Sequence, residues 1–218
     1  MRKLVTAVAI AAMFSAASPA FAERGDMLIK MRGSYNLRSG SDTAVVSVGG
    51  SNVSAKASNS VGAEAAADFF VSENFAVEAA FGGSSYEINN SAGNTLASAG
   101  LINPSLTLLY YPTTSARIRP YIGGGAAYVN FYSEKPGEIL TNQHVIQPVT
   151  YSAVMKSNLA PVGQVGADIS LDNKFYLNID GKYMLANSKV TIVQGIVSQT
   201  VKQNMSSFVI GAGVGFKF

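Results

Sequence analysis

The chain has 218 residues and no cysteine, and only 13% of its residues are charged, which is about half the usual share for a soluble domain. The absence of cysteine excludes a disulfide framework and a thiolate metal site. The 16 Lys and Arg residues and the 13 Asp and Glu residues are scattered along the chain, so no basic stripe indicates nucleic acid as a partner.

The first 22 residues have the layout of a secretory signal peptide. Two basic residues precede an apolar run over 4–14, and small residues end in Ala20 and Ala22, as at a cleavage site. The alternative is an N-terminal anchor, but the apolar run is well short of the roughly 20 residues that span a bilayer. We therefore expect a signal peptide over 1–22 and one domain over 23–218.

The domain after residue 22 has no apolar run long enough for a membrane helix, which needs about 18 residues or more. An exported chain with so few charges must still bury its apolar surface. Within lipid every backbone polar group has to be paired inside the protein, so strands can cross only as a closed barrel. The composition therefore predicts an outer-membrane β-barrel of a Gram-negative bacterium.

Eight segments alternate with period two, as strands of a membrane barrel do when one face meets lipid and the other meets the lumen. These segments are 27–37, 61–69, 75–82, 101–111, 119–132, 158–171, 175–185 and 207–218. The connections alternate between short turns at 72–74, 112–118 and 172–174 and long polar loops at 38–60, 84–100, 133–157 and 186–205. The pattern predicts an all-β fold, an eight-stranded antiparallel transmembrane barrel with short periplasmic turns, long extracellular loops and both termini in the periplasm.

Two of the predicted strands have unusual features. The segment 101–111 places Pro104 on its outward face, although proline is restricted to strand edges, first residues and bulges. The segment 119–132 places Tyr121, Val129 and Phe131 on one face. We expect the aromatic ends of this segment to contribute to the interfacial girdles of the barrel.

The inward faces carry most of the charge of the barrel. The candidate lumen charges are Lys30, Arg32, Glu64, Asp68, Glu78, Asp168, Asp180 and Lys182, with Lys217 near the last residue. An eight-stranded barrel is just wide enough for side chains to fill it, and buried charges are tolerated only when they are paired. One interpretation is therefore a salt-bridged plug that fixes the shape of the barrel, and the other is a polar track or gate for solutes.

Three segments together resemble the OmpW family of eight-stranded outer-membrane proteins. They are 30–35 (KMRGSY), 103–112 (NPSLTLLYYP) and 119–131 (RPYIGGGAAYVNF), and the last two are the most specific. The ending VGFKF over 214–218 looks like the signal that barrel-assembly machinery recognises in this class, with Phe218 as the terminal aromatic residue. The resemblance implies a narrow barrel that passes small apolar compounds, with outer-membrane lipid and lipopolysaccharide as surroundings and no cofactor.

The sequence leaves other functions to consider. A hydrolase or acyltransferase site in the loops would need a positioned base, and the only histidine, His144, lies in a polar loop near Ser133, Glu134 and Ser152. Polar loops supply such residues by chance, so we expect no enzyme and no metal site. A lipocalin-like soluble barrel would have the opposite pattern, with an apolar lumen.

Two functional hypotheses therefore remain. The first is a narrow channel for the passive passage of small apolar or amphipathic solutes. The second is a structural or adhesive surface protein that acts through its extracellular loops, because loops on a rigid scaffold often carry function. The strand-like residues 145–149 in the third loop leave its conformation open.

Overall fold

The computed structural model describes residues 24–38, 44–48, 51–90, 93, 95–113, 115–136, 151–155, 157–194, 197–204 and 206–218. The predicted signal peptide, His144 and the residues 145–149 lie outside this described part. The side chains of Ser133, Glu134 and Ser152 are also outside it. Among the described residues, no helix is long and apolar enough to cross a membrane.

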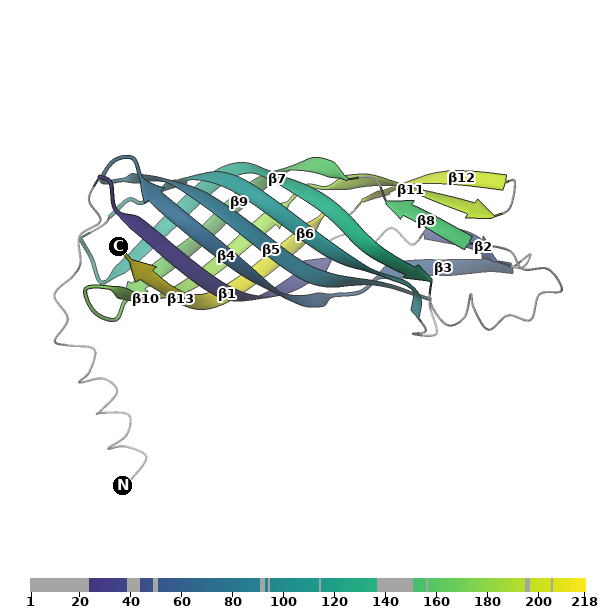
Figure 1. Cartoon of the computed structure of the whole chain (residues 1–218), viewed down its shortest axis with the longest axis horizontal. Helices are drawn as coiled ribbons and strands as arrows, with labels where there is room; N and C mark the ends of the chain where they lie inside the picture. Colours follow the sequence, from purple (N-terminus) through teal and green to yellow (C-terminus); the bar gives the residue numbers. More distant parts are fainter. Residues whose placement is uncertain are drawn as a thin grey trace, which may run out of the picture.

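Eight antiparallel strands form a closed barrel, which confirms the predicted fold class (Figure 1). They are β1 (Met27–Arg38), β4 (Ser60–Phe70), β5 (Phe75–Asn90), β6 (Thr95–Tyr110), β7 (Ile118–Pro136), β9 (Asn158–Ser170), β10 (Phe175–Met184) and β13 (Ser207–Lys217). Around the barrel the order is β1, β13, β10, β9, β7, β6, β5 and β4, and the first strand pairs with the last. Short turns join β4 to β5, β6 to β7 and β9 to β10, as predicted.

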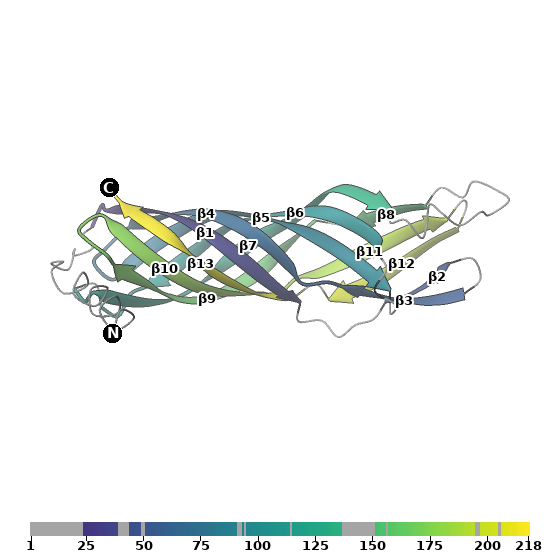
Figure 2. The same ribbon diagram turned by 90° about the horizontal axis from the view of Figure 1, so that it is seen from below.

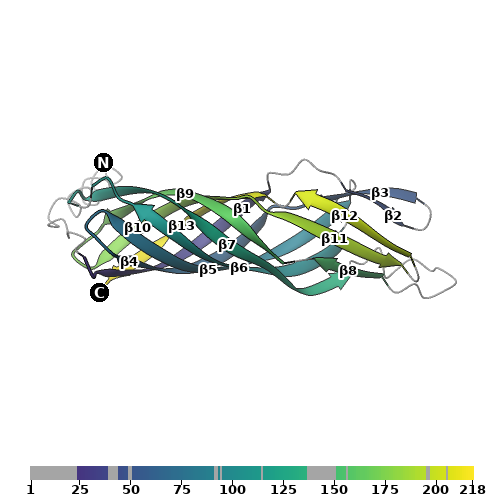
Figure 3. The same cartoon turned by 90° about the horizontal axis from the view of Figure 1, so that it is seen from above.

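At the end opposite the C-terminus, strands continue beyond the barrel (Figures 1, 2 and 3). A hairpin of β2 (Ala44–Val48) and β3 (Ser51–Ala57) pairs with β5. A separate sheet contains β8 (Tyr151–Met155), β11 (Asn187–Gln194) and β12 (Val197–Asn204). These segments lie within the regions that we predicted as long loops.

The prediction of a long loop over 84–100 was wrong. The strands β5 and β6 pair as far as Asn89 and Thr95, so that few residues connect them. The Ser, Asn and Gly residues of this segment suggested a loop because they lack an apolar outward face. A strand that extends into water needs no such face, and its backbone hydrogen bonds can continue the hairpin.

Side chains alternate along the barrel strands between lipid-facing and lumen-facing positions. In β1, for example, Met31 is 59% exposed, whereas the neighbouring Lys30 and Arg32 are buried. The outward face also carries aromatic contacts at the turn end, where Phe175 lies 5.2 Å from Phe216 between ring centroids. This alternation gives an apolar exterior and a polar interior, as a barrel in lipid requires.

The strand β7 carries aromatic residues on both of its faces. Tyr121, Val129 and Phe131 are buried inside the barrel, whereas Tyr128 and Tyr132 are about half exposed. Both faces of this strand carry aromatic residues, so aromaticity alone did not distinguish them. The better signal was Arg119, which has the same parity as Tyr121 and is also buried.

Pro104 interrupts the pairing of β6 with β7. On one side of β6, Pro104 lies opposite Phe81 of β5. On the other side, Ile102 and Ser105 pair with β7 in one register, but the ladder has no β7 partner for Asn103 or Pro104 between them. Since proline has no N–H group to donate, the wall of the barrel is locally unpaired between these two strands.

Candidate functional site

Nine charged side chains are buried inside the described part of the barrel. They include all eight candidate lumen charges predicted from the sequence, together with Arg119, which was not among the predicted residues. Lys217 instead lies at the rim of the barrel, where its Nζ atom is 2.5 Å from Asp26 Oδ2 and both side chains are 20% exposed. The buried charges come from six strands, so only the closed barrel brings them together.

Lys30 is the centre of the half of the network nearer the turns. Its Nζ atom is 2.7 Å from Asp68 Oδ2 and 3.3 Å from Asp168 Oδ1. The Tyr111 hydroxyl lies 2.9 Å from Asp68 Oδ2 and 3.0 Å from Asp168 Oδ2. Arg119 stacks over the Tyr176 ring, with 4.3 Å between its Cζ atom and the ring centroid. These residues form the part of the network nearest the turns.

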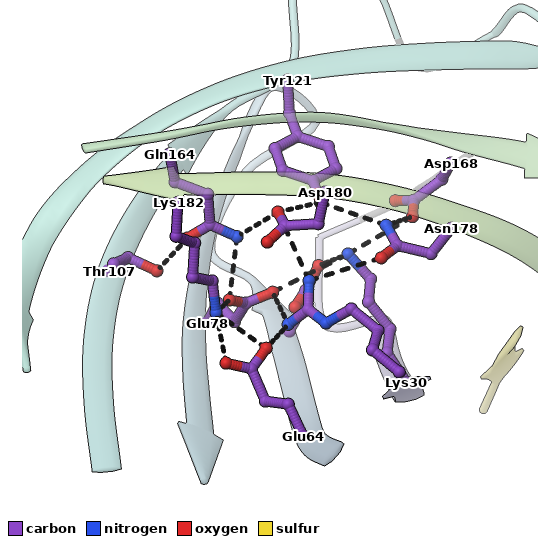
Figure 4. A network of polar contacts seen from close by, with 12 residues as sticks. Lys30, Glu64, Glu78, Thr107, Tyr121, Gln164, Asp168, Asn178, Asp180 and Lys182 are labelled. Carbon is purple, nitrogen blue, oxygen red and sulfur yellow. Dashed lines mark hydrogen bonds and ion pairs between the residues drawn. The ribbon is translucent and has the colours of Figure 1, made fainter. Parts of the chain in front are cut away.

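Arg32 and Lys182 bind the carboxylates of the other half, and Figure 4 shows Lys182 beside Glu64 and Glu78. Arg32 Nη2 is 2.6 Å from Glu64 Oε1 and 3.0 Å from Glu78 Oε2. Lys182 Nζ is 2.8 Å from Glu64 Oε1 and 3.0 Å from Glu78 Oε1. Glu64 therefore contacts two cations, and Glu78 contacts these two and Lys30 as well. These contacts offset the large desolvation cost of burying the two carboxylates.

Uncharged polar side chains complete the network, in a role that the sequence alone did not indicate. Gln164 Nε2 donates to Glu78 Oε1 at 2.9 Å and to Asp180 Oδ2 at 2.8 Å. Asn178 Nδ2 donates to Asp168 Oδ1 at 2.8 Å, and the Tyr121 hydroxyl donates to Asp180 Oδ2 at 2.7 Å. Their inward parity was visible in the sequence, but their partners lie on distant strands.

Apolar clusters lie at both ends of this network. Towards the turns, seven residues at the strand ends form one cluster, which comprises Leu28, Phe70, Ala76, Leu109, Tyr111, Tyr121 and Tyr176. Towards the loops, a second group comprises Ala127, Val162, Met184 and Val209. A third group, at the loop ends of the strands, comprises Ala99, Leu101, Val129, Phe131, Ala160 and Ala186. We call this third group the loop-end apolar cluster.

The interior near the loops has a polar side as well. Asn36 of β1, Ser60 of β4 and Ser207 of β13 are buried on three neighbouring strands. Asn36 Nδ2 donates to the Ser60 carbonyl oxygen at 3.3 Å. The Ser60 hydroxyl has no hydrogen-bond partner among the described residues. Because the loop-end apolar cluster comes mostly from β6, β7 and β9, the two sides of this interior differ in polarity.

The sequence matches the OmpW family over residues 23–218. The chain is 27% identical over 155 residues to the uncharacterized outer-membrane protein y4mB of Sinorhizobium fredii and 28% identical over 156 residues to the outer membrane protein AlkL of Ectopseudomonas oleovorans. Each match covers 69% of this chain, and 62% and 63% of the respective relative. The matched part of the chain thus spans less than two thirds of the length of these two relatives.

Two solved structures resemble the fold closely. The crystal structure of the outer membrane protein OprG from Pseudomonas aeruginosa superposes with a TM-score of 0.75 at 20% identity, covering 90% of this chain and 97% of OprG. The NMR structure of AlkL in lipid bilayers superposes with a TM-score of 0.64 at 24% identity, covering 90% of this chain and 91% of AlkL. At these identities the likeness supports the barrel architecture alone.

Proposed function

Because this chain belongs to the OmpW family and is an outer-membrane β-barrel, we propose that it admits small apolar or amphipathic solutes from outside the cell. In this proposal, solutes enter the barrel from the loop end and leave sideways through the wall into the membrane. The passage is passive, since it uses only differences in polarity along the route. One observation supports this proposal above all. The charged network fills the middle of the barrel, and the loop-end apolar cluster lies on its extracellular side.

The charged network makes an axial route unfavourable. An apolar solute that moved straight towards the turns would have to displace nine buried charges and their partners. Separating a single buried ion pair costs about 3–5 kcal/mol. The turn end of the interior is also packed with side chains, including Tyr111 and Tyr176, which are fully buried. The loop end offers apolar contacts without this cost.

The two-sided interior near the loops supports amphipathic solutes in particular. A solute with an apolar chain and a polar head would place the chain against Leu101 and Val129. Its head would face Asn36 and Ser60, and the Ser60 hydroxyl would gain a partner. A buried hydroxyl without a partner costs about 1–3 kcal/mol, so filling that position favours binding.

The unpaired stretch beside Pro104 supports a lateral exit. Here the β6 residues Asn103 and Pro104 have no ladder partners in β7. On the inner side lie Leu101 and Val129, and on the outer side Leu106 is 59% exposed. Separating the two strands at this point breaks no ladder pair, so it requires less energy than at a regularly paired part of this seam.

The proposal can be tested with a disulfide that reversibly links β6 and β7 at this unpaired stretch. In the register that holds on both sides of the break, Pro104 faces Tyr128, so the double variant Pro104→Cys/Tyr128→Cys can form a disulfide in a chain without other cysteines. We expect cells with the oxidised variant to take up the apolar dye 1-N-phenylnaphthylamine as slowly as cells without the protein. Reduction should restore uptake.

A matched control uses a regular part of the same seam. Leu108 and Gly124 are paired in the ladder, so Leu108→Cys/Gly124→Cys should form a disulfide without changing uptake. Ala160→Trp tests entry, because Ala160 is fully buried in the loop-end apolar cluster, and Ala65→Trp on the outward face is its control. Wild-type uptake by both the oxidised Pro104→Cys/Tyr128→Cys variant and Ala160→Trp would contradict the proposal.

The extramembrane strands favour a second candidate function, binding at the cell surface. The β2–β3 hairpin and the sheet of β8, β11 and β12 extend the strands beyond the barrel (Figure 3). Replacing residues 188–203 by a short turn would remove the β11–β12 hairpin and leave the barrel strands intact. Loss of host-cell attachment with unchanged dye uptake would support this function instead.

A separate proposal concerns the export of the chain and its assembly in the outer membrane. We propose that residues 1–22 are removed on export, and that the terminal Phe218 is recognised by barrel-assembly machinery. Phe218 supports this role because its ring is 65% exposed on the outside of the barrel. The first point is tested by the N-terminal sequence of protein purified from outer membranes, which should begin at Glu23.

A further inference from the structure

We propose that the lumen network binds one proton at neutral pH, held by the Asp68 carboxyl and hydrogen-bonded through the Tyr111 hydroxyl to the Asp168 carboxylate. In this proposal the proton compensates buried negative charge in the folded barrel, as the four buried cations do. The proposal is independent of the solute route, because it concerns only the network that closes the interior towards the turns.

The charge of the network is the first argument. Its buried cations are Lys30, Arg32, Arg119 and Lys182, and its buried carboxylates are Glu64, Asp68, Glu78, Asp168 and Asp180. The described interior thus holds four cations and five carboxylates. A single uncompensated charge in a medium of low dielectric constant is very costly, and such a group is usually neutralised by a proton.

The hydrogen-bond geometry around Tyr111 is the second argument. Its hydroxyl oxygen is 2.9 Å from Asp68 Oδ2 and 3.0 Å from Asp168 Oδ2. A tyrosine hydroxyl has one hydrogen to donate, so it can donate to only one of two carboxylates. If Asp68 is protonated, its hydroxyl donates to Tyr111 and Tyr111 donates to Asp168. Both short contacts are then hydrogen bonds.

The unequal satisfaction of the two aspartates places the proton on Asp68. Asp168 accepts from Asn178 and Tyr111 and pairs with Lys30. Asp68 Oδ2 contacts Lys30 and Tyr111, but Asp68 Oδ1 is buried and accepts no hydrogen bond from any described residue. An unpartnered carbonyl oxygen of a neutral acid costs less than an unpartnered oxygen of a carboxylate.

The groups that face Asp68 determine how firmly the proton is held. Lys30 from β1 lies 2.7 Å away and favours the ionised form. Glu78 from β5 and Asp168 from β9 both approach Lys30, at 3.9 and 3.3 Å, and compete for its charge. Tyr121 from β7 lies under the same ammonium group, 4.8 Å from the ring centroid. Glu78 also pairs with Arg32 and Lys182, and Asp168 lies 4.0 Å from Arg119, whereas Asp68 pairs with Lys30 alone among the described residues. Asp68 is therefore the carboxyl group that keeps the proton.

The direct experiment is carbon-13 NMR of the refolded full-length barrel, labelled at the aspartate carboxyl carbons. At neutral pH one aspartate signal should have the chemical shift of a protonated carboxyl, and it should be the signal that is missing in Asp68→Asn. The exposed Asp172→Asn variant is the control and should retain it. The proposal is overturned if every aspartate signal has the shift of a carboxylate, or if the protonated signal belongs to Asp168.

The pH dependence of stability is a second, independent measurement. The free carboxyl of an unfolded chain ionises near pH 4, so folding takes up a proton above that pH. The unfolding equilibrium constant of the wild type, relative to Asp68→Asn, should therefore rise about tenfold per pH unit between about pH 5 and 7. The same pH dependence in both proteins would contradict the proposal.

Discussion

Lys182 of β10 binds both carboxylate oxygens of Glu64 of β4, at 2.8 and 2.9 Å, although β1 and β13 separate their strands. Both residues are almost completely buried. The pair thus joins two separate parts of the barrel wall through its interior. It also lies at the loop end of the charged network, next to the apolar residues Met184 and Val209.

Removing one partner of this pair should strongly destabilise the barrel. We expect Lys182→Met to lower the free energy of unfolding by about 3–5 kcal/mol, because it leaves buried carboxylate charge uncompensated. The double variant Lys182→Met/Glu64→Gln removes both charges and should recover more than half of the loss. Urea unfolding of the refolded barrel in micelles, followed by gel migration, measures both effects. Equal losses in the single and double variants would contradict a charge effect.

The filled interior predicts that the barrel conducts ions poorly. In planar bilayers, the refolded wild type should show no discrete conductance steps above the background of the lipid. The network spans the barrel from Lys30 to Lys182, and its members contact one another directly. Replacing Lys30, Arg32 and Asp68 by alanine together should produce steps if the barrel still folds. Large steps in the wild type would show that the network is open.

Gly213 should not tolerate a side chain. A Cβ atom at this position would meet the backbone oxygen of Met31 and the Cα atom of Arg32 in the neighbouring strand. Since backbone atoms cannot move away cheaply, Gly213→Ala should cost about 1–3 kcal/mol of stability. Gly163→Ala is the matched control, because nothing lies within 4 Å of its Cβ position. A shift in urea midpoint for Gly163→Ala as large as for Gly213→Ala would refute this explanation.

The turn between β9 and β10 should lose stability in acid. The Asp172 carboxylate accepts hydrogen bonds from the backbone N–H groups of Lys174 and Phe175, both at 2.7 Å, and these bonds lower the pKa of Asp172. Because the pKa is lowered by folding, the stabilisation is present above about pH 4 and is lost as the pH falls further. The difference in urea midpoint between wild type and Asp172→Ala should therefore shrink below about pH 4. A constant difference down to strong acid would exclude this mechanism.

The terminal aromatic residue should matter more for assembly than for folding. Phe218 donates its backbone N–H to Met27 at 2.8 Å, and its ring packs on Phe216 at 4.8 Å. We expect Phe218→Ala to refold normally in detergent but to reduce, by several-fold, the heat-modifiable barrel found in outer membranes. Phe208→Ala removes another exposed ring from the same strand and should not have this effect. Equal reductions in both variants would argue against terminal recognition.

Much of this protein could be predicted from its sequence, because a barrel in lipid imposes a local rule. Successive side chains face the lipid and the lumen in turn. Lys30 and Arg32 alternate with apolar residues such as Met31, so they indicate the inward face without any knowledge of other strands. The same rule yielded the strand number, the short turns and the eight candidate lumen charges. The rule was weak in β7, where both faces are aromatic, and beyond the lipid, where neither face needs to be apolar.

The contacts inside the barrel were decided by the tertiary structure alone. Period two shows that Lys182 faces inward, but not that Glu64, which lies 118 residues earlier, is its partner. That pairing depends on the closure of the barrel and on the stagger between its strands, which no single strand encodes. The partners of Tyr111 and the unpaired seam beside Pro104 depend on the same relations between strands. Sequence alone thus indicated most of the charged residues that enter the lumen, and only the closed barrel determined which of them meet.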